Sequence, residues 1–199
     1  MRALAMFRRL IVKSRLFGRA QEAVAAVEFA MILPLLLTLY MGSAELSQLI
    51  NVDQRITVIA GTVGDLVARS NGEVTATDLS DYFQAATAVI SPFPTSSLQQ
   101  VVTLVYVKSD GTTQIKWSKT LNGTAYTTNA AYSTTHPIPS TLTNAVKGTT
   151  SPYVVVGEAQ YTYQPLLGFF FKTPFTLYHQ SFYLPRYPGI ICYDATTCS

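Results

Sequence analysis

The sequence predicts an α+β fold in which one long N-terminal helix packs on an antiparallel sheet of about four strands. Two observations carry this prediction. An apolar stretch at residues 24–43 continues into apolar residues spaced three and four apart as far as Ser70, which is helical periodicity. Short runs rich in valine, threonine and aromatic residues, bounded by turn signals, follow from residue 101, and these are typical of strands.

Residues 24–43 are the predicted transmembrane helix. At 1.5 Å per residue this stretch is long enough to cross a hydrocarbon core of about 30 Å. Pro34 lies near its middle, where it removes one backbone hydrogen bond and is expected to kink the helix. Glu28 is the one ionisable residue near its start.

Basic residues are concentrated before this helix. Residues 1–23 hold six of the 14 lysines and arginines against one acid, whereas the remainder holds eight basic and ten acidic residues. The positive-inside rule therefore predicts a cytoplasmic leader at 1–23, a single pass, and export of residues 44–199. Six cations spread beside a membrane span are a topology signal, so we expect no nucleic-acid partner. A cleaved secretory signal peptide fits less well because the apolar stretch is too long and Pro34 interrupts it.

Residues 44–70 read as an exported continuation of the same helix, ending between Gly61 and Ser70. In the exported domain, 71–199, Thr77 or Asp78 is expected to cap a second helix over Leu79–Ile90.

The remainder of the exported domain reads as β structure. A hairpin is indicated by Asp110-Gly111 between two strand-like runs. Residues 121–151 are polar and rich in threonine, asparagine and proline, which predicts a surface insertion with little regular structure. The four expected strands are 101–107, 113–117, 153–163 and 175–183.

Glu28 has two interpretations. In the first, it lies at the membrane interface in the first turn of a helix, where the helix dipole tolerates an acid. In the second, the chain is cut after Ala23, and the new α-amino cation of Val24 lies in the same layer as the carboxylate. An acid inside a membrane helix costs several kcal/mol unless a partner neutralises it. The two interpretations therefore differ in what stabilises Glu28, which is the helix dipole in the first and the α-amino group in the second.

The N-terminal pattern resembles a known signal. A basic leader, small apolar residues, Glu-Phe and an apolar helix with a central proline resemble the signal of type IV pilin-like proteins. The string AVAAVEFAMILPLLL at 23–37 resembles the start of TadE-like pseudopilins of the tight-adherence (Flp, type IVc) pilus system. Residues 158–167, 173–177 and 184–186 also resemble that family's C-terminal run "Y-x-Y-x-P-L-L … P-x-T-L … R-P", with the last dipeptide inverted.

The resemblance implies a pilin-like architecture and a minor pseudopilin that takes part in pilus assembly. A prepilin peptidase would cut between Ala23 and Val24, although the family usually has glycine in place of this alanine. Glu28 would be the assembly residue. The implied setting is the inner membrane, with the C-terminal domain periplasmic or carried into an extracellular pilus. The implied partners are pilin and pseudopilin subunits, the assembly platform and the peptidase. The rival interpretation is an uncleaved membrane-anchored adaptor of the same apparatus.

Cys192 and Cys198 lie near the C-terminus. In an exported domain such a pair is most simply a disulfide that closes a small loop and stabilises by about 2 kcal/mol. Zinc binding is the alternative, for which His136 and His179 would have to supply the remaining ligands.

No catalytic motif is present. The sequence contains no G-x-S-x-G, no H-E-x-x-H and no glycine-rich phosphate loop. We therefore expect no enzyme activity, cofactor, metal or small-molecule substrate, and we interpret His179 as a packing residue on a strand. A membrane-tethered enzyme or solute-binding domain would instead need a polar pocket with converging titratable groups. Phe169–Phe171, between two strands, is a candidate patch for docking another subunit.

Overall fold

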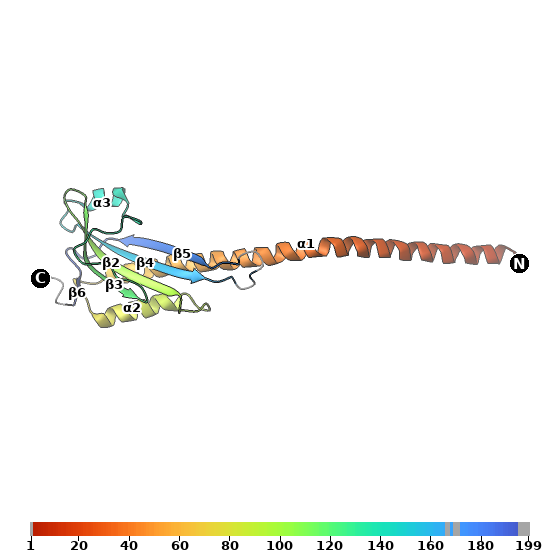
Figure 1. Cartoon of the computed structure of the whole chain (residues 1–199), viewed down its shortest axis with the longest axis horizontal. Coiled ribbons are helices and arrows are strands. Elements are labelled where there is room, and N and C mark those ends of the chain that lie inside the picture. The colour runs from red at the N-terminus through yellow and green to blue at the C-terminus, as the bar shows by residue number, and fades with distance from the viewer. Residues whose placement is uncertain (1, 166–167, 169–171, 195–199) are drawn as a thin grey trace. The chain divides into compact units, whose positions relative to one another are not determined.

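The structure is a computed structural model that describes residues 2–165, 168 and 172–194, with side chains from Val24 onward (Figure 1). The chain divides into two compact units, residues 1–47 and residues 48–199. The α+β fold class predicted from the sequence is confirmed, because a long N-terminal helix is followed by a four-stranded antiparallel sheet.

Helix α1 spans Arg2–Ala68 and contains Pro34. Its C-terminal end lies within the predicted interval. The Arg69 amide donates to the Asp65 carbonyl at 3.1 Å in the last turn, and Gly72 then takes a positive φ of 82°. That backbone conformation favours glycine and ends the helical path of the chain.

The main sheet has the strand order β3-β2-β4-β5, and every neighbouring pair is antiparallel. The bounds of β4 and β5 agree with the prediction, whereas β2 begins earlier and β3 ends later than predicted. The early start of β2 is hidden in the sequence because two glutamines interrupt its apolar pattern. One of these, Gln100, is fully buried, and its amide nitrogen donates to Thr87 Oγ1 at 2.7 Å. The strands are β2 (Leu98–Val107), β3 (Thr113–Leu121), β4 (Tyr153–Tyr163) and β5 (Phe175–Tyr183).

The main hydrophobic core lies on one face of this sheet. Residues 48–68 of α1 and helix α2 (Ala76–Ala88) supply its helical side. Trp117, the single tryptophan, is 2% exposed there, and its indole nitrogen donates to the Ile191 carbonyl at 2.6 Å. Fully buried members from α1 are Val52, Ile56, Ile59, Ala60, Val63 and Val67.

Two glycines let α1 approach β4 closely. A Cβ built on Gly157 of β4 would lie 2.2 Å from the Ala60 carbonyl oxygen and 2.9 Å from the Gly64 nitrogen. A Cβ on Gly64 would lie 2.8 Å from the ring of Tyr183. From the sequence, Gly64 makes the end of the helix uncertain, because glycine is a poor helix former. In the fold, the absence of a side chain on Gly64 leaves space for the Tyr183 ring of β5 and for the Gly157 backbone of β4.

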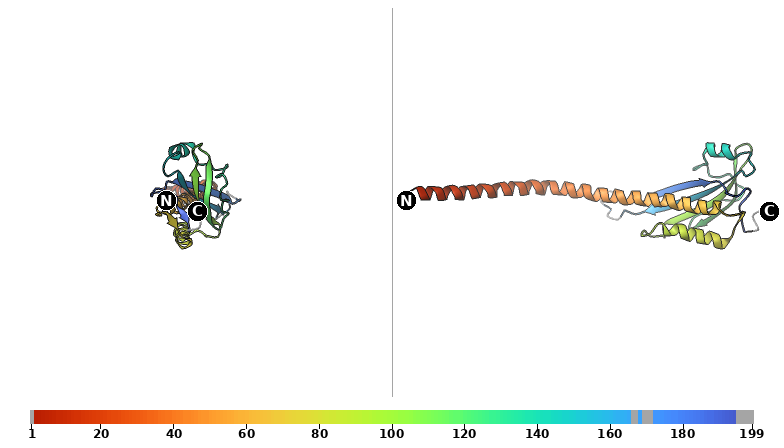
Figure 2. Two further views of the ribbon diagram at one scale, coloured as in Figure 1. Left: turned by 90° about the vertical axis from the view of Figure 1, so that its left-hand side faces the viewer. Right: turned by 180° about the vertical axis from the view of Figure 1, so that it is seen from behind.

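The opposite face of the sheet carries a second core, to which residues 121–151 contribute three buried side chains. Apart from the last residue of β3 and one short helix, this segment has little regular structure, and most of its residues are exposed. This segment contains helix α3 (Ser140–Val146), which lies across the sheet from α2 (Figures 1 and 2). Tyr132, Ile138 and Val146 are buried against valines and an isoleucine of β2, β3 and β4. The sequence conceals this core because the few apolar residues of the segment follow no helical or strand period.

Helix α2 begins three positions earlier and ends two positions earlier than predicted. Its N-cap is Thr75, whose hydroxyl accepts from the Asp78 amide at 3.1 Å, while Asp78 Oδ2 accepts from the Thr75 amide at 3.1 Å. This capping box satisfies two N–H groups at the helix start. Asp78 is therefore the N3 partner of the cap rather than the cap.

The other end of α2 is fixed by Arg55 of α1. Arg55 Nη1 donates to the Val89 carbonyl at 2.6 Å and to the Ser91 carbonyl at 2.5 Å. Its guanidinium also lies 5.9 Å from the ring centre of Phe93. A cation at this position suits the negative end of the helix dipole.

Two short strands, which the sequence did not reveal, join the segment after α1 to the segment after β5. β1 (Glu73–Val74) pairs in parallel with β6 (Cys192–Tyr193). Asp194 Oδ1 accepts from the Ala76 amide at 3.2 Å. Strands of two residues leave no periodic pattern, so they depend on tertiary contacts.

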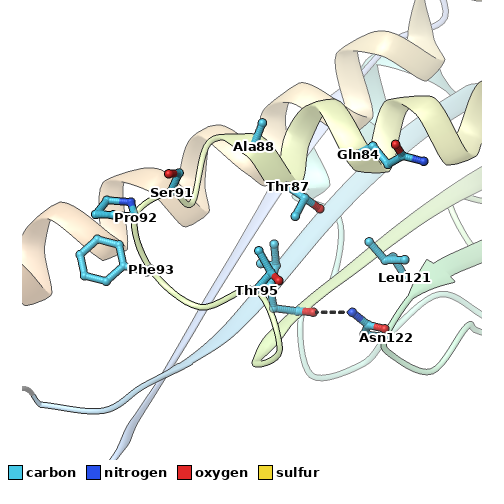
Figure 3. A pocket seen from close by; sticks show the side chains of 10 residues that line it. Gln84, Thr87, Ala88, Ser91, Pro92, Phe93, Thr95, Leu121 and Asn122 are labelled. Carbon is cyan, nitrogen blue, oxygen red and sulfur yellow. Dashed lines mark hydrogen bonds between the residues drawn. The ribbon is translucent and has the colours of Figure 1, made fainter.

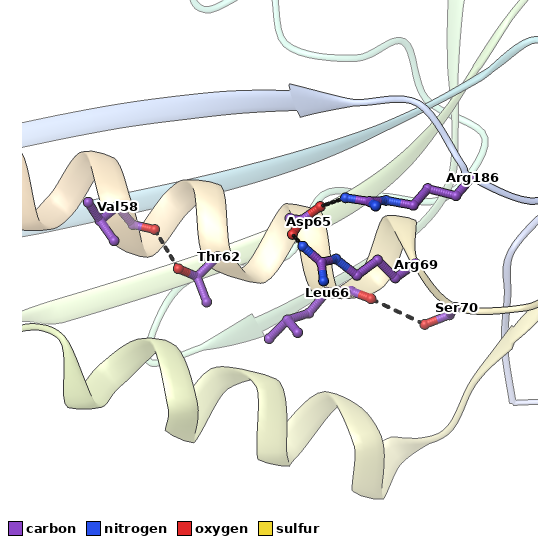
Figure 4. Close-up of polar contacts among 7 residues, drawn as sticks. All are labelled: Val58, Thr62, Asp65, Leu66, Arg69, Ser70 and Arg186. Carbon is purple, nitrogen blue, oxygen red and sulfur yellow. Dashed lines mark hydrogen bonds and ion pairs between the residues drawn. The ribbon is translucent and has the colours of Figure 1, made fainter.

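Asp65 ties the end of α1 to the segment after β5. Its carboxylate pairs with Arg69 and, at 2.6 Å, with Arg186 (Figure 4). The Arg186 amide also donates to the Ala68 carbonyl at 2.9 Å. The hydrogen bonds from Arg69 and then Arg186 hold the pKa of the Asp65 carboxyl below its usual range.

Replacing Gly157 with alanine should destabilise the fold by about 3 kcal/mol, because the new methyl group meets backbone atoms that cannot move aside. Thermal unfolding of the full chain in detergent micelles, followed by Trp117 fluorescence, measures this effect. Gly72→Ala is the control. It meets no atom within 4 Å but has a positive φ, so it should cost only about 1 kcal/mol. Equal costs for the two variants would contradict the close-approach argument.

Asp65→Asn should lower the unfolding temperature at neutral pH and have little effect in acid. A carboxyl whose pKa is lowered on folding contributes stability above its unfolded pKa of about 3.9, and this contribution is lost as the pH falls through the folded value. The gap between wild type and variant should therefore close as the pH falls below about 4. Asp81→Asn removes an exposed carboxylate of α2 and should show no such gap. A gap for Asp65→Asn that persisted in acid would refute the ion-pair interpretation.

Candidate functional site

The first part of α1 presents a continuous exposed apolar surface. Every side chain from Val24 to Tyr40 is exposed. The helix includes an 18-residue window with a mean hydropathy of 2.0 and is long and apolar enough to cross a membrane. Apolar patches of this extent on soluble proteins mark surfaces that lipid or another protein covers. The large exposed apolar residues here include Val27, Phe29, Met31, Ile32, Leu33, Leu35, Leu36, Leu37 and Leu39.

Glu28 is the one acidic or basic residue between Val24 and Ala44. Its side chain is exposed and has no hydrogen bond or ion pair among the residues that the structure describes. The side chains one turn away cannot supply a partner, because Val24 and Ile32 lie four positions before and after it. Any group that neutralises this carboxylate inside a membrane must therefore come from elsewhere.

The helix dipole does not account for Glu28 in the uncut chain. Because α1 begins at Arg2, Glu28 lies many turns inside the helix, whereas the dipole acts within the first turn. The interpretation that placed this acid in a first turn is therefore wrong for the uncut chain. A helix that began at Val24 would bring Glu28 close to the first turn.

The other predicted residues of this segment also lie in α1. The backbone is helical through Ala23 and Val24, and the Val24 side chain is 58% exposed. Pro34 lies inside the helix, and its carbonyl accepts a hydrogen bond from Thr38 Oγ1 at 2.7 Å. The kink at Pro34 and the cut at Ala23–Val24 stay predictions.

Two further predictions involve residues outside those that the structure describes. Cys192 lies in β6, but Cys198 lies outside the described residues, so the disulfide and its zinc alternative stay predictions. Phe169–Phe171 also lie outside them. The described residues contain no group of three or more histidines, cysteines or acids that could hold a metal.

His179 makes a contact that the sequence does not predict. It lies on β5, as predicted, but its Nε2 is 2.7 Å from Asp53 Oδ1 of α1. On this strand, His179 therefore makes a polar link between the sheet and the helix. The sequence does not show this contact because the two residues are far apart in the chain.

Glu158 is a buried acid that sequence analysis missed. It lies on β4, is 2% exposed, and accepts hydrogen bonds at Oε1 from three tyrosine hydroxyls. Burial, and then the nearby negative charge of Glu158, raise the pKa of the Tyr126 and Tyr132 hydroxyls. The only available signal was the crowding of tyrosines in the C-terminal half.

An open pocket lies where α2 ends (Figure 3). It has a volume of about 550 Å³ and is open to solvent beside the start of β2 and the end of β3. Asn122 Nδ2 donates to the Leu98 carbonyl at 3.5 Å on one side of it. None of its lining side chains is ionisable. The lining residues are Gln84, Thr87, Ala88, Ser91, Pro92, Phe93, Thr95, Leu98, Leu121 and Asn122.

The described part of the chain thus combines a helix long enough to cross a membrane with an α+β domain. Its most prominent surface is the exposed apolar segment of that helix. A family model described as TadE-like protein matches residues 23–61. The match begins at the residue before the predicted cut and includes Glu28 and Pro34, but it covers less than half of the chain. The resemblance seen in the sequence is confirmed over this segment. No curated protein and no solved structure matches the chain.

Proposed function

We propose that this protein is a minor pseudopilin that takes part in the assembly of a tight-adherence (Tad/Flp-type) pilus. Its role is structural rather than catalytic. The observation that carries the proposal is the exposed apolar helix from Val24 to Tyr40 with a single acid, Glu28, which coincides with the match to the TadE-like family. A membrane holds such a helix before assembly, and neighbouring apolar helices cover it in a filament.

In this proposal a prepilin peptidase removes residues 1–23. The cut exposes the α-amino group of Val24, and Glu28 becomes the fifth residue of the mature chain. The amine of a neighbouring subunit, or of the same chain, then pairs with Glu28. A paired carboxylate is far less costly outside water than a lone one. The absence of a partner for Glu28 among the described residues of the uncut chain supports this assignment.

The setting that follows is the inner membrane. The basic leader would stay in the cytoplasm, and residues 44–199 would lie in the periplasm before the subunit joins a filament. The partners would be pilin and pseudopilin subunits, the assembly platform and the peptidase. The apolar surface of α1 is the feature of this chain that such helical partners would contact.

One observation favours the rival function, an uncleaved anchor and adaptor of the same apparatus. The backbone of α1 is helical on both sides of the Ala23–Val24 bond. A peptidase binds its substrate in an extended form, so the helix would have to unwind locally before cleavage. The mature N-terminus separates the two functions.

The intact mass of the protein extracted from membranes tests the cut. We expect a mature chain that begins at Val24 in cells with an active prepilin peptidase and a full-length chain in cells without it. Ala23→Gly should be cut at least as well, because glycine is the usual residue in the family that this segment resembles. Ala23→Leu should stay uncut, since a bulky side chain replaces a small one. A full-length wild-type protein in the presence of the peptidase would favour the adaptor.

Glu28→Gln should leave membrane insertion intact and lower incorporation into pilus fractions about tenfold, which corresponds to losing about 1.4 kcal/mol of pairing. Quantitative immunoblots of membrane and sheared pilus fractions measure both quantities. Glu73→Gln makes the same charge change at an exposed position of β1 and should have no effect. Normal incorporation of Glu28→Gln would remove the pairing argument and leave the processing prediction untouched.

A further inference from the structure

Glu158 has an uneven set of hydrogen bonds. Its Oε1 accepts from the hydroxyls of Tyr126 at 2.9 Å, Tyr132 at 3.0 Å and Tyr178 at 2.5 Å. Its Oε2 is buried and has no hydrogen-bond partner among the residues that the structure describes. A buried acceptor without a donor costs about 1–3 kcal/mol, and more if it is charged.

The three tyrosines come from two different segments of the chain. Tyr178 lies on β5, whereas Tyr126 and Tyr132 belong to the polar segment that covers this face of the sheet. Burial and the charge of Glu158 raise the pKa of all three hydroxyls. They are therefore neutral donors at physiological pH and cannot serve as counter-ions.

A cavity lies directly beside this cluster. It has a volume of about 270 Å³ and is lined by Glu158, by two of its three tyrosines and by polar side chains of the sheet. None of the lining residues that the structure describes is a cation, so none of them neutralises the acid. The lining residues are Gln99, Val101, Thr124, Ala125, Tyr126, Glu158, Ala159, Gln160 and Tyr178.

We propose that this cavity binds a cation that carries N–H donors, either a primary ammonium or a guanidinium group, and that the cation donates to Glu158 Oε2. The carboxylate supplies the charge, and the unpaired oxygen supplies the acceptor. The aromatic rings of Tyr126 and Tyr178 give the alkyl part of the ligand an apolar wall and favour a cation beside them. The side-chain carbonyl oxygens of Gln99 and Gln160 are further acceptors for the remaining N–H groups.

Because Oε2 is buried, a ligand can reach it only if a neighbouring side chain moves, and Tyr126 is suited to this. Tyr126 is only half-buried and comes from a connecting segment rather than from a strand. If its hydroxyl leaves Oε1, Tyr132 and Tyr178 still donate there. The carboxylate thus stays held on β4 while its other oxygen becomes reachable.

The test is a titration of the full-length protein in detergent micelles, with tyrosines labelled with ¹³C at Cζ and observed by NMR. The probes are n-butylammonium, which has three N–H donors, and tetramethylammonium, which has the same charge and none. Tyr126→Phe assigns one signal. We expect n-butylammonium to shift the Tyr126 and Tyr178 signals saturably, with a Kd of about 1–10 mM, and tetramethylammonium to bind about tenfold more weakly or not at all.

Glu158→Gln should weaken n-butylammonium binding about tenfold, because one charge-assisted hydrogen bond is lost. Glu73→Gln, at an exposed position outside the cavity, should bind as the wild type does. If Glu158→Gln fails to fold, the comparison of the two probes on the unsubstituted protein still decides the question. Equal binding of both probes, no saturable shift with n-butylammonium, or full binding by a folded Glu158→Gln protein would each overturn the proposal. The last two outcomes would leave a buried water as the partner of Oε2.

A further arm distinguishes the sources of the ligand. Nα-acetyl-lysine methylamide represents a lysine side chain of another polypeptide, and putrescine represents a free amine. Tighter binding of the blocked lysine assigns the cavity to a protein partner, and tighter binding of putrescine assigns it to a soluble amine. Failure of both to displace n-butylammonium would contradict the proposed ligand class.

Discussion

The close approach of α1 to β4 is the constraint on which the unit of residues 48–199 depends. The Ala60 carbonyl and the Gly64 backbone occupy the space that a side chain at position 157 would need. Helix and strand therefore pack backbone to backbone. This contact sets the depth at which the apolar side of α1 enters the core. The helix therefore lies close enough to the sheet for several of its valines and isoleucines to be fully buried before it ends at Ala68. Overpacking at such a point cannot be relieved by a rotamer change, because the neighbours are backbone atoms.

The same strand separates the two sides of the domain. On β4, Val155, Gly157 and Ala159 face the helices, whereas Val154, Val156 and Glu158 face the segment that contains α3. This alternation is the period-two pattern of a strand buried on both faces. Glu158 occupies the end of the second core, where tyrosines from a polar connection can reach it.

The sequence revealed elements whose signals are local. The periodicity of α1, the Asp110-Gly111 turn and the bounds of β4 and β5 were all readable because each depends on neighbouring residues. The capping residue of α2 was misplaced by two or three positions, since several polar residues there could cap. The second core and the β1–β6 pair were missed, because the residues that form them are distant in the chain and follow no period.

Glu28 and Glu158 illustrate the difference between features that the sequence reveals and features that appear only in the fold. The neighbours of Glu28 in the sequence are also its neighbours in space, because a helix places them one turn away. Its lack of a charged partner on the described helical turns around it can therefore be inferred from the order of the residues alone. Glu158 is surrounded by residues from β5 and from the connection before α3, and its environment exists only after folding. For an acid in a predicted helix, the sequence is thus enough to infer that the carboxylate needs a partner from outside the helix. For an acid in a central strand, the same inference requires the folded structure, in which the hydrogen bonds of each carboxylate oxygen can be counted.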